Sequence, residues 1–186
     1  MAYWSSGRPY DAYQVFRKAA ELNPSHAGAQ TRLAEMMATS RDDKIATEGK
    51  KLAEDAASLA PGDPEALYAL ALTEYRLGDM QSSEHQLRRI LGQFPTNLQS
   101  SVALATLHME RKDYAGAEKV LRLAVEKDPS SAEARLALGN TQELIGNQHA
   151  AEATYQDLLK TQPKNGPALI RLARLQLEAG RTEQVR

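Results

Sequence analysis

The stretch that decides the fold is SSAEARLALGNTQELIGNQHAAEATYQDLLKTQP, residues 130–163. It holds two amphipathic segments separated by Gly146-Asn147, and it closes at Pro163. Glycine accepts the left-handed conformation that ends a helix, and proline is excluded from helix interiors. The stretch therefore predicts a helix, a tight turn, a second helix and a proline turn.

The same marks recur along the chain at intervals of 34 residues. The prolines are Pro61, Pro95, Pro129 and Pro163, and Pro24 lies 37 residues before Pro61. The turns inside each unit are Gly78-Asp79, Lys112-Asp113, Gly146-Asn147 and Gly180-Arg181. A fixed period of this length indicates a repeat architecture.

Each predicted helix carries a fixed arrangement of large and small residues. In the first helix of each unit a leucine precedes a small residue: Leu33-Ala34, Leu70-Ala71, Leu104-Ala105, Leu138-Gly139 and Leu172-Ala173. In the second helix a small residue is followed by larger ones four and seven positions later, as in Ala151, Tyr155 and Leu158. This spacing places them on one face, where small residues let helices approach closely and cross at about 20°. We expect Ala117 and Gly139 to be buried at such approaches.

In its 34-residue period, its Leu-small pairs and its closing prolines, the chain resembles the tetratricopeptide repeat family over essentially its whole length. The resemblance implies an all-α fold, a right-handed superhelical solenoid of antiparallel helix pairs. We predict a single array with a partial repeat at 1–24, an expanded repeat at 25–61, regular repeats at 62–95, 96–129 and 130–163, and a partial repeat at 164–186.

The expanded and partial repeats carry further expectations. We place the three extra residues of 25–61 in a longer turn around residues 40–46. The partial repeats leave the faces of helices 10–22 and 167–179 unpaired, so we expect these faces to meet another copy of the chain. Repeats cut in this way also favour a piece of a longer protein, with a short natural protein as the alternative.

Composition excludes several classes of function. Of 186 residues 42% are hydrophobic but only 5% aromatic, so the core must be built mostly from alanine and leucine, which are strong helix formers. The net charge of −1 gives no general attraction to nucleic acid or to an anionic membrane. No stretch approaches the roughly 18 apolar residues of a membrane helix, so we expect no direct membrane insertion. The compartment stays open between the cytoplasm and, for part of a longer bacterial protein, the periplasm.

Candidate catalytic and metal-binding residues are sparse. None of the four histidines has another within four residues, and there is no cysteine. No nucleophile elbow, phosphate loop or paired-carboxylate motif is present. We therefore predict no metal, no cofactor and no enzymatic activity. His108 is the one histidine whose register lies near the inner face of its unit, so we expect it to face the groove.

The resemblance implies a concave groove, lined by the first helices, that binds a peptide. The groove candidates are Tyr68, Leu72, Tyr75, Arg76, Thr106, Met109, Glu110, Asn140, Glu143, Arg171 and Arg174. Packing against neighbouring helices is the alternative for Tyr68, Leu72 and Met109. Some family members clamp acidic chaperone tails with Lys or Arg and then Asn in the first inner helix. Thr31 and Glu35 stand there instead, so we do not assign that function.

The predicted function is that of a protein-interaction scaffold, with a peptide or a partner segment in the groove. One alternative is a self-assembly module whose exposed repeat ends make homo-oligomers. Another is a spacer within a bacterial envelope or polysaccharide-export protein. The groove should be polarised, because residues 164–186 carry a net charge of +3. Inner positions of earlier units are acidic instead: Glu35, Glu65, Glu110, Glu133 and Glu143.

Overall fold

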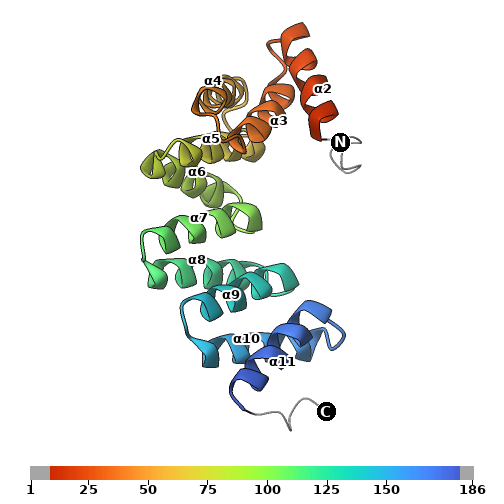
Figure 1. Ribbon diagram of the computed structural model, residues 1–186, viewed down its shortest axis with the longest axis vertical. Helices are drawn as coiled ribbons and strands as arrows, with labels where there is room; N and C mark the ends of the chain where they lie inside the picture. The colour runs from red at the N-terminus through yellow and green to blue at the C-terminus, as the bar shows by residue number, and fades with distance from the viewer. Residues whose placement is uncertain (1–8, 181–186) are drawn as a thin grey trace. The chain divides into compact units, whose positions relative to one another are not determined.

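The computed structural model describes residues 9–180, and within that range it contains ten α-helices and no strand (Figure 1). The chain divides into an N-terminal unit, Met1–Phe94, and a C-terminal unit, Pro95–Arg186. Within each unit, helices that follow one another in sequence pack together in antiparallel pairs. The prediction of an all-α solenoid of helix pairs is confirmed.

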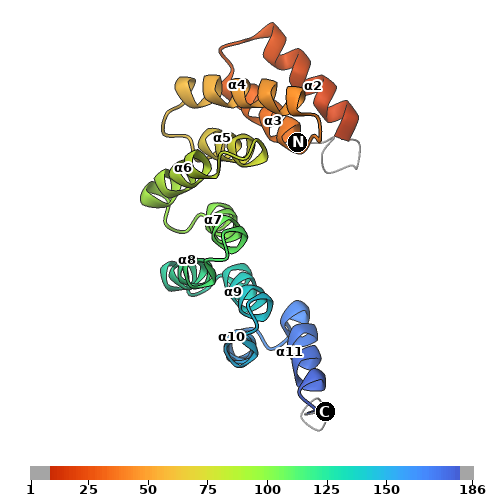
Figure 2. The same cartoon turned by 60° about the vertical axis from the view of Figure 1, so that its left-hand side comes forward.

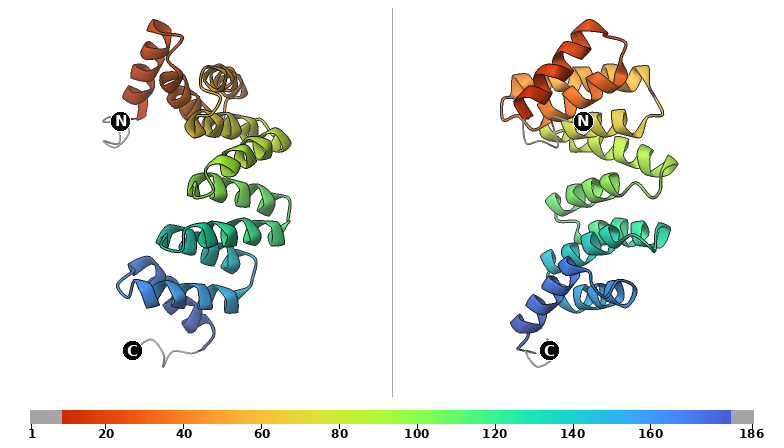
Figure 3. Two further views of the ribbon diagram at one scale, coloured as in Figure 1. Left: turned by 180° about the vertical axis from the view of Figure 1, so that it is seen from behind. Right: turned by 90° about the vertical axis from the view of Figure 1, so that its right-hand side faces the viewer.

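Two kinds of helix alternate along the chain. The first helices of the repeats are α3 (Ala27–Ala38), α5 (Pro64–Arg76), α7 (Leu98–Glu110), α9 (Ala132–Leu144) and α11 (Gly166–Glu178). The second helices are α2 (Pro9–Leu22), α4 (Asp43–Leu59), α6 (Met80–Gln93), α8 (Tyr114–Lys127) and α10 (Gln148–Thr161). Within the C-terminal unit, α7, α9 and α11 lie on one side and α8 and α10 on the other (Figure 2). Figure 3 follows the short connections of each unit from two further sides.

Polar caps and left-handed turns fix the helix ends. Each helix from α3 to α11 begins at a residue whose side chain accepts a hydrogen bond from a backbone N–H of the first turn. Such a cap stabilises a helix by about 1 kcal/mol. Gly78 and Gly146 have φ of 83°, and Lys112 takes the equivalent place at φ 59°. The predicted turns at these three positions are confirmed.

The prediction of a longer turn in the expanded repeat is wrong. The α3–α4 turn, Thr39–Asp42, has one residue more than the α5–α6 turn, Leu77–Asp79, but α3 is one residue shorter than α5. The excess lies in α4, which has 17 residues against 14 in α6. The Asp42 side chain accepts a hydrogen bond from Lys44 N and starts this helix, so the extra residues extend a helix instead of a loop.

The core consists of small residues facing large ones across each helix pair. Gly139 of α9 is buried, and a Cβ there would lie 2.4 Å from Cε1 of Tyr155 on α10. Glycine thus lets the tyrosine ring pack directly on the α9 backbone. Ala117 of α8 is fully buried in a cluster with Ala105, Leu121 and Leu138. The predicted burial of Ala117 and Gly139 is confirmed.

Buried polar residues occupy one equivalent position of the first helices. Gln142 of α9 donates to Glu118 Oε1 at 2.9 Å and accepts from Thr154 Oγ1 at 2.7 Å. Glu74 is the equivalent residue of α5, and its Oε2 is buried without a hydrogen-bond partner. Burial raises the pKa of Glu74 to about 7, and the nearby Lys50 charge offsets only part of that effect. Glu74 is therefore a poorly satisfied acid inside the N-terminal unit.

Replacing Ala117 with leucine should destabilise the chain. The larger side chain has no space between α7 and α9, and overpacking of this kind costs about 1–3 kcal/mol. Urea unfolding of Ala117→Leu measures the loss. Ala115→Leu is the matched control, because Ala115 is exposed on the same helix. Equal unfolding midpoints for the two variants would show that the packing described here is wrong.

Replacing Glu74 with glutamine should stabilise the chain in a pH-dependent way. The folded-state pKa of about 7 lies above the ordinary value of about 4.3, so the wild type loses stability as the pH rises through this window. Glutamine carries no charge at any pH. We expect Glu74→Gln to gain about 1–3 kcal/mol over the wild type at pH 8, with the gap closing toward pH 4.

Thermal unfolding at several pH values measures this gap. Glu126→Gln serves as the control, because Glu126 is exposed on α8. A gap that is the same at pH 4 and pH 8 would contradict the assignment of a raised pKa to Glu74.

Candidate functional site

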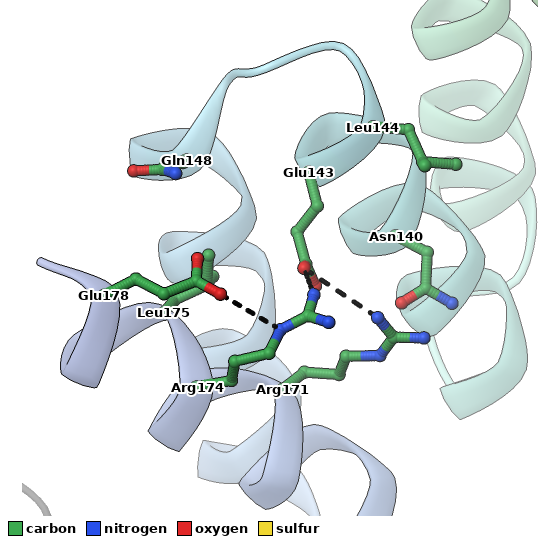
Figure 4. A pocket seen from close by; sticks show the side chains of 8 residues that line it. All are labelled: Asn140, Glu143, Leu144, Gln148, Arg171, Arg174, Leu175 and Glu178. Atoms are coloured by element: carbon green, nitrogen blue, oxygen red, sulfur yellow. Dashed lines mark hydrogen bonds and ion pairs between the residues drawn. The ribbon is translucent and has the colours of Figure 1, made fainter.

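A cavity of 460 Å³ lies between α9 and α11 of the C-terminal unit (Figure 4). We call it the α9–α11 pocket. Its lining residues are Asn140, Glu143, Leu144, Gln148, Arg171, Arg174, Leu175 and Glu178. Four groove candidates from the sequence are among them: Asn140, Glu143, Arg171 and Arg174. The structure therefore brings these four residues to one place.

Glu143 links three helices at the floor of the pocket. Its Oε1 accepts a hydrogen bond of 2.6 Å from the hydroxyl of Tyr155 on α10. Its Oε2 accepts one from Arg174 on α11 and lies 3.8 Å from Nη1 of Arg171 (Figure 4). The Glu143 side chain is only 9% exposed. This carboxylate thus holds α9, α10 and α11 together and is not a free negative charge of the groove.

Tyr155 is a hydrogen-bond donor at the base of this network. Burial, and then its hydrogen bond to Glu143, raise the pKa of Tyr155 well above its ordinary value. The hydroxyl also lies 2.8 Å from Asn140 Oδ1. Because one hydroxyl carries one proton, it donates to one of these two oxygens at a time. Tyr155 therefore stays protonated at neutral pH and positions Glu143 and Asn140.

The rim of the pocket offers both cationic and apolar groups. Arg171 reaches Glu143 only at 3.8 Å, which is longer than a hydrogen bond, and its side chain is 40% exposed. A guanidinium carries five N–H donors in a fork that matches a carboxylate. Leu144, which also lines the pocket, is 73% exposed. Ile170 and Leu177 of α11 are exposed as well, but they do not line the pocket. The pocket therefore presents a cationic hydrogen-bond donor, Arg171, and an apolar side chain, Leu144.

The groove candidates of α5 lie in the N-terminal unit and are engaged differently. Arg76 Nε donates to the Ser40 carbonyl at 2.6 Å, and its guanidinium lies 3.0 Å from Asp43. Arg76 therefore tethers α5 to the start of α4, and its place in a groove stays a prediction. Tyr68, Leu72 and Tyr75 are half-buried.

On α7, Thr106 and Glu110 are exposed, whereas Met109 packs against the cluster of Ala105 and Leu121. The packing alternative is thus favoured for Met109. His108 Nδ1 lies 2.7 Å from Asp113 Oδ2, at the residue that caps α8. Its side chain therefore braces the α7–α8 turn, and the expectation that it faces a groove is corrected.

Ion pairs neutralise much of the predicted charge polarity. The Arg32 guanidinium lies 2.8 Å from Glu35 and 2.6 Å from Glu65, so one cation of α3 serves both acids. Glu143 is paired with Arg174. Three of the five acids expected to give the groove a negative character are therefore compensated by arginines.

Four pocket residues and Tyr155 are not among the groove candidates of the sequence. Leu144 and Glu178 are equivalent to Arg76 and Glu110, at successive 34-residue steps, so the repeat register alone could have identified them. Gln148 and Leu175 line the pocket from α10 and α11. Tyr155 was placed in the core stripe, where it does lie, but its hydroxyl reaches the site. The hydroxyl itself was the signal, because a buried tyrosine O–H needs a polar partner.

Two negative findings apply to residues 9–180. No group of three His, Asp or Glu side chains in this range lies close enough to hold a metal ion. None of its helices is long and apolar enough to cross a bilayer. The absence of enzymatic activity stays a prediction.

The sequence matches models of one repeat family along most of its length. Three models described as tetratricopeptide repeat match residues 78–140 and 108–165, residues 47–97, and residues 1–26. A curated relative, cellulose synthase operon protein C of Pseudomonas fluorescens (strain SBW25), is 29% identical over 174 residues. The match covers 88% of this chain and spans 13% of the length of that protein.

Solved structures show the same fold at low identity. The structure of pilF of Pseudomonas aeruginosa has a TM-score of 0.71 and 17% identity, over 99% of this chain and 82% of that one. YrrB, described as a TPR protein with an unusual peptide-binding site, has a TM-score of 0.55 and 17% identity, over 91% and 86% of the two chains.

Proposed function

Because this chain belongs to the tetratricopeptide repeat family, we propose that it is a protein-interaction scaffold whose α9–α11 pocket binds an extended segment of a partner. The fold supports the general role of a scaffold for protein–protein interaction. One observation carries the specific proposal. Arg171, whose guanidinium lies 3.8 Å from its acceptor Glu143, and the exposed Leu144 line the same cavity. The described peptide-binding site of YrrB supports it by analogy.

The pocket defines the chemistry of the segment. A carboxylate of the partner would take the donors of Arg171, which Glu143 leaves without a close acceptor. An apolar side chain of the same segment would cover Leu144. Burying apolar area would supply most of the affinity, and the charge pair would set the orientation and the association rate.

Selection from a displayed library of random 12-residue peptides tests the proposal. We expect the enriched peptides to combine an acidic residue with a large apolar one. Arg171→Gln and Leu144→Glu should each weaken binding at least tenfold, about 1.4 kcal/mol, in fluorescence anisotropy. Binding should also weaken as the salt concentration rises.

Leu123→Glu is the matched control for Leu144→Glu. Leu123 is exposed on α8, a second helix, and does not line the pocket. It should leave the affinity unchanged. Failure to enrich any peptide, or equal losses from Leu123→Glu and Leu144→Glu, would reject the pocket as the binding site.

A second candidate function is a role in bacterial polysaccharide export. It is favoured by the 29% identity to cellulose synthase operon protein C, which extends over 88% of this chain. Under this proposal the repeats act as a scaffold or spacer within a longer protein of such an apparatus. The two candidates are compatible, because a scaffold in an export system still needs a binding surface.

A chimera tests the second candidate. Residues of this chain would replace the aligned 174-residue segment of the Pseudomonas fluorescens protein, and secreted cellulose would be measured in a strain that lacks the native protein. We expect secretion to be retained at the level of the native protein. A chimera that accumulates normally but secretes no cellulose would overturn this proposal and leave the peptide-binding proposal untouched.

A further inference from the structure

Glu143 is a charged residue at a position where other first helices carry apolar or aromatic residues. Its equivalents, at 34-residue steps, are Tyr75 of α5, Met109 of α7 and Leu177 of α11. Met109 packs against an apolar cluster that contains Leu121 of α8. The packing of α7 on α8 therefore needs no carboxylate at this position, so the repeat fold alone does not account for the charge of Glu143.

The partners of Glu143 are also specific to this part of the chain. Its Oε2 accepts a hydrogen bond from Arg174 and lies 3.8 Å from Nη1 of Arg171 (Figure 4). Alanines stand at the positions equivalent to Arg171 in α5, α7 and α9. The residues equivalent to Arg174 are Leu72, Thr106 and Asn140. The combination of one acid with two arginines is therefore particular to α9 and α11, and all three residues line the α9–α11 pocket.

The Glu143 carboxylate engages the two arginines to different degrees. Arg174 donates to Glu143, and its Nε also lies 3.8 Å from Oε1 of Glu178. Arg171 lies beyond hydrogen-bond length from Glu143. The lining of the pocket thus holds two cations and two acids, and the Glu143 carboxylate leaves the N–H fork of Arg171 open to an incoming group.

We propose that Glu143 determines the specificity of the pocket: it allows a segment with one carboxylate to bind and rejects a segment with two neighbouring acids. This inference rests on the proposed binding of an acidic and apolar segment at the α9–α11 pocket. The first carboxylate of such a segment binds to Arg171. A second carboxylate beside it approaches Arg174, which is already paired with Glu143, and the charge of Glu143 repels it.

Burial strengthens the effect of Glu143 on a group inside the pocket. Its side chain is 9% exposed, whereas that of Glu178, the other acid of the lining, is 53% exposed. Water and salt screen the charge of an exposed side chain, and they screen a buried charge much less. Bringing two like charges together in such a place disfavours the wrong partner. Glu143 is therefore the acid of the lining that repels a second carboxylate most strongly.

Three peptides with blocked ends and common Gly-Ser flanks test the proposal, because their side chains then carry the only carboxylates. Their central sequences are Leu-Ser-Asn-Asn without an acid, Leu-Ser-Asp-Asn with one acid and Leu-Ser-Asp-Asp with two. Isothermal titration calorimetry measures the affinities. We expect the wild type to bind the monoacidic peptide more tightly than the acid-free peptide, and the diacidic peptide no more tightly than the monoacidic one. Glu143→Gln releases Arg174 and should bind the diacidic peptide about tenfold more tightly than the monoacidic one.

Glu126→Gln is the matched control for Glu143→Gln. It removes one negative charge from the same unit, at an exposed residue of α8 that does not line the pocket. Its preference between the peptides should equal that of the wild type. Circular dichroism establishes that each variant is folded. If Glu143→Gln is not, Glu143→Met repeats the test, because α7 carries methionine at the equivalent position.

The outcomes separate this inference from the proposed function on which it rests. A wild type that prefers the diacidic peptide would overturn the inference alone, as would an unchanged preference in Glu143→Gln or an equal change in Glu126→Gln. A purely structural Glu143 would give the second of these results, since its loss would weaken both acidic peptides alike. Equal affinity of the wild type for the acid-free and monoacidic peptides would overturn the proposed carboxylate binding at Arg171, and this inference with it.

Discussion

The structure depends on the close approach of a small residue on one helix to a larger residue on the helix paired with it. Gly139 against the Tyr155 ring is the closest case, since even a Cβ would lie 2.4 Å from a ring carbon. The apolar groups of such a pair are removed from water without many aromatic residues, which suits a chain that is 5% aromatic. Within each unit, the described helices are thus held by the helices next to them in the stack.

This constraint separates stability from function within one helix. A first helix uses its Leu-small face for packing, so its opposite face is left for other contacts. On α9 that division places Leu138 and Gly139 in the core and Leu144 at the pocket rim. Glu143 lies between the two faces and serves both, because it joins three helices and also orders the arginines of α11. The pocket is therefore built on a rigid base.

The periodicity of the sequence was enough to predict the helix pairs, the turns at Gly78, Lys112 and Gly146, and the burial of Ala117 and Gly139. It could not show which element holds the three extra residues of the expanded repeat, residues 25–61. A period gives the length of a unit but does not say which helix or turn within it is longer. The site was predicted in part. Asn140, Glu143, Arg171 and Arg174 do meet, but Arg76 turns to Ser40 and Asp43. Where a long side chain points depends on acceptors in other helices, which a linear pattern does not show.

The central claim is that each helix owes its stability to the neighbours that cover it. Native-state hydrogen exchange of the whole chain, followed by mass spectrometry at a concentration where it is monomeric, tests this most directly. The account predicts that amides of α2 and α11, each open on one face, exchange faster than those of α9 and α10. Protection of α2 and α11 equal to that of α9 and α10 under these conditions would contradict it.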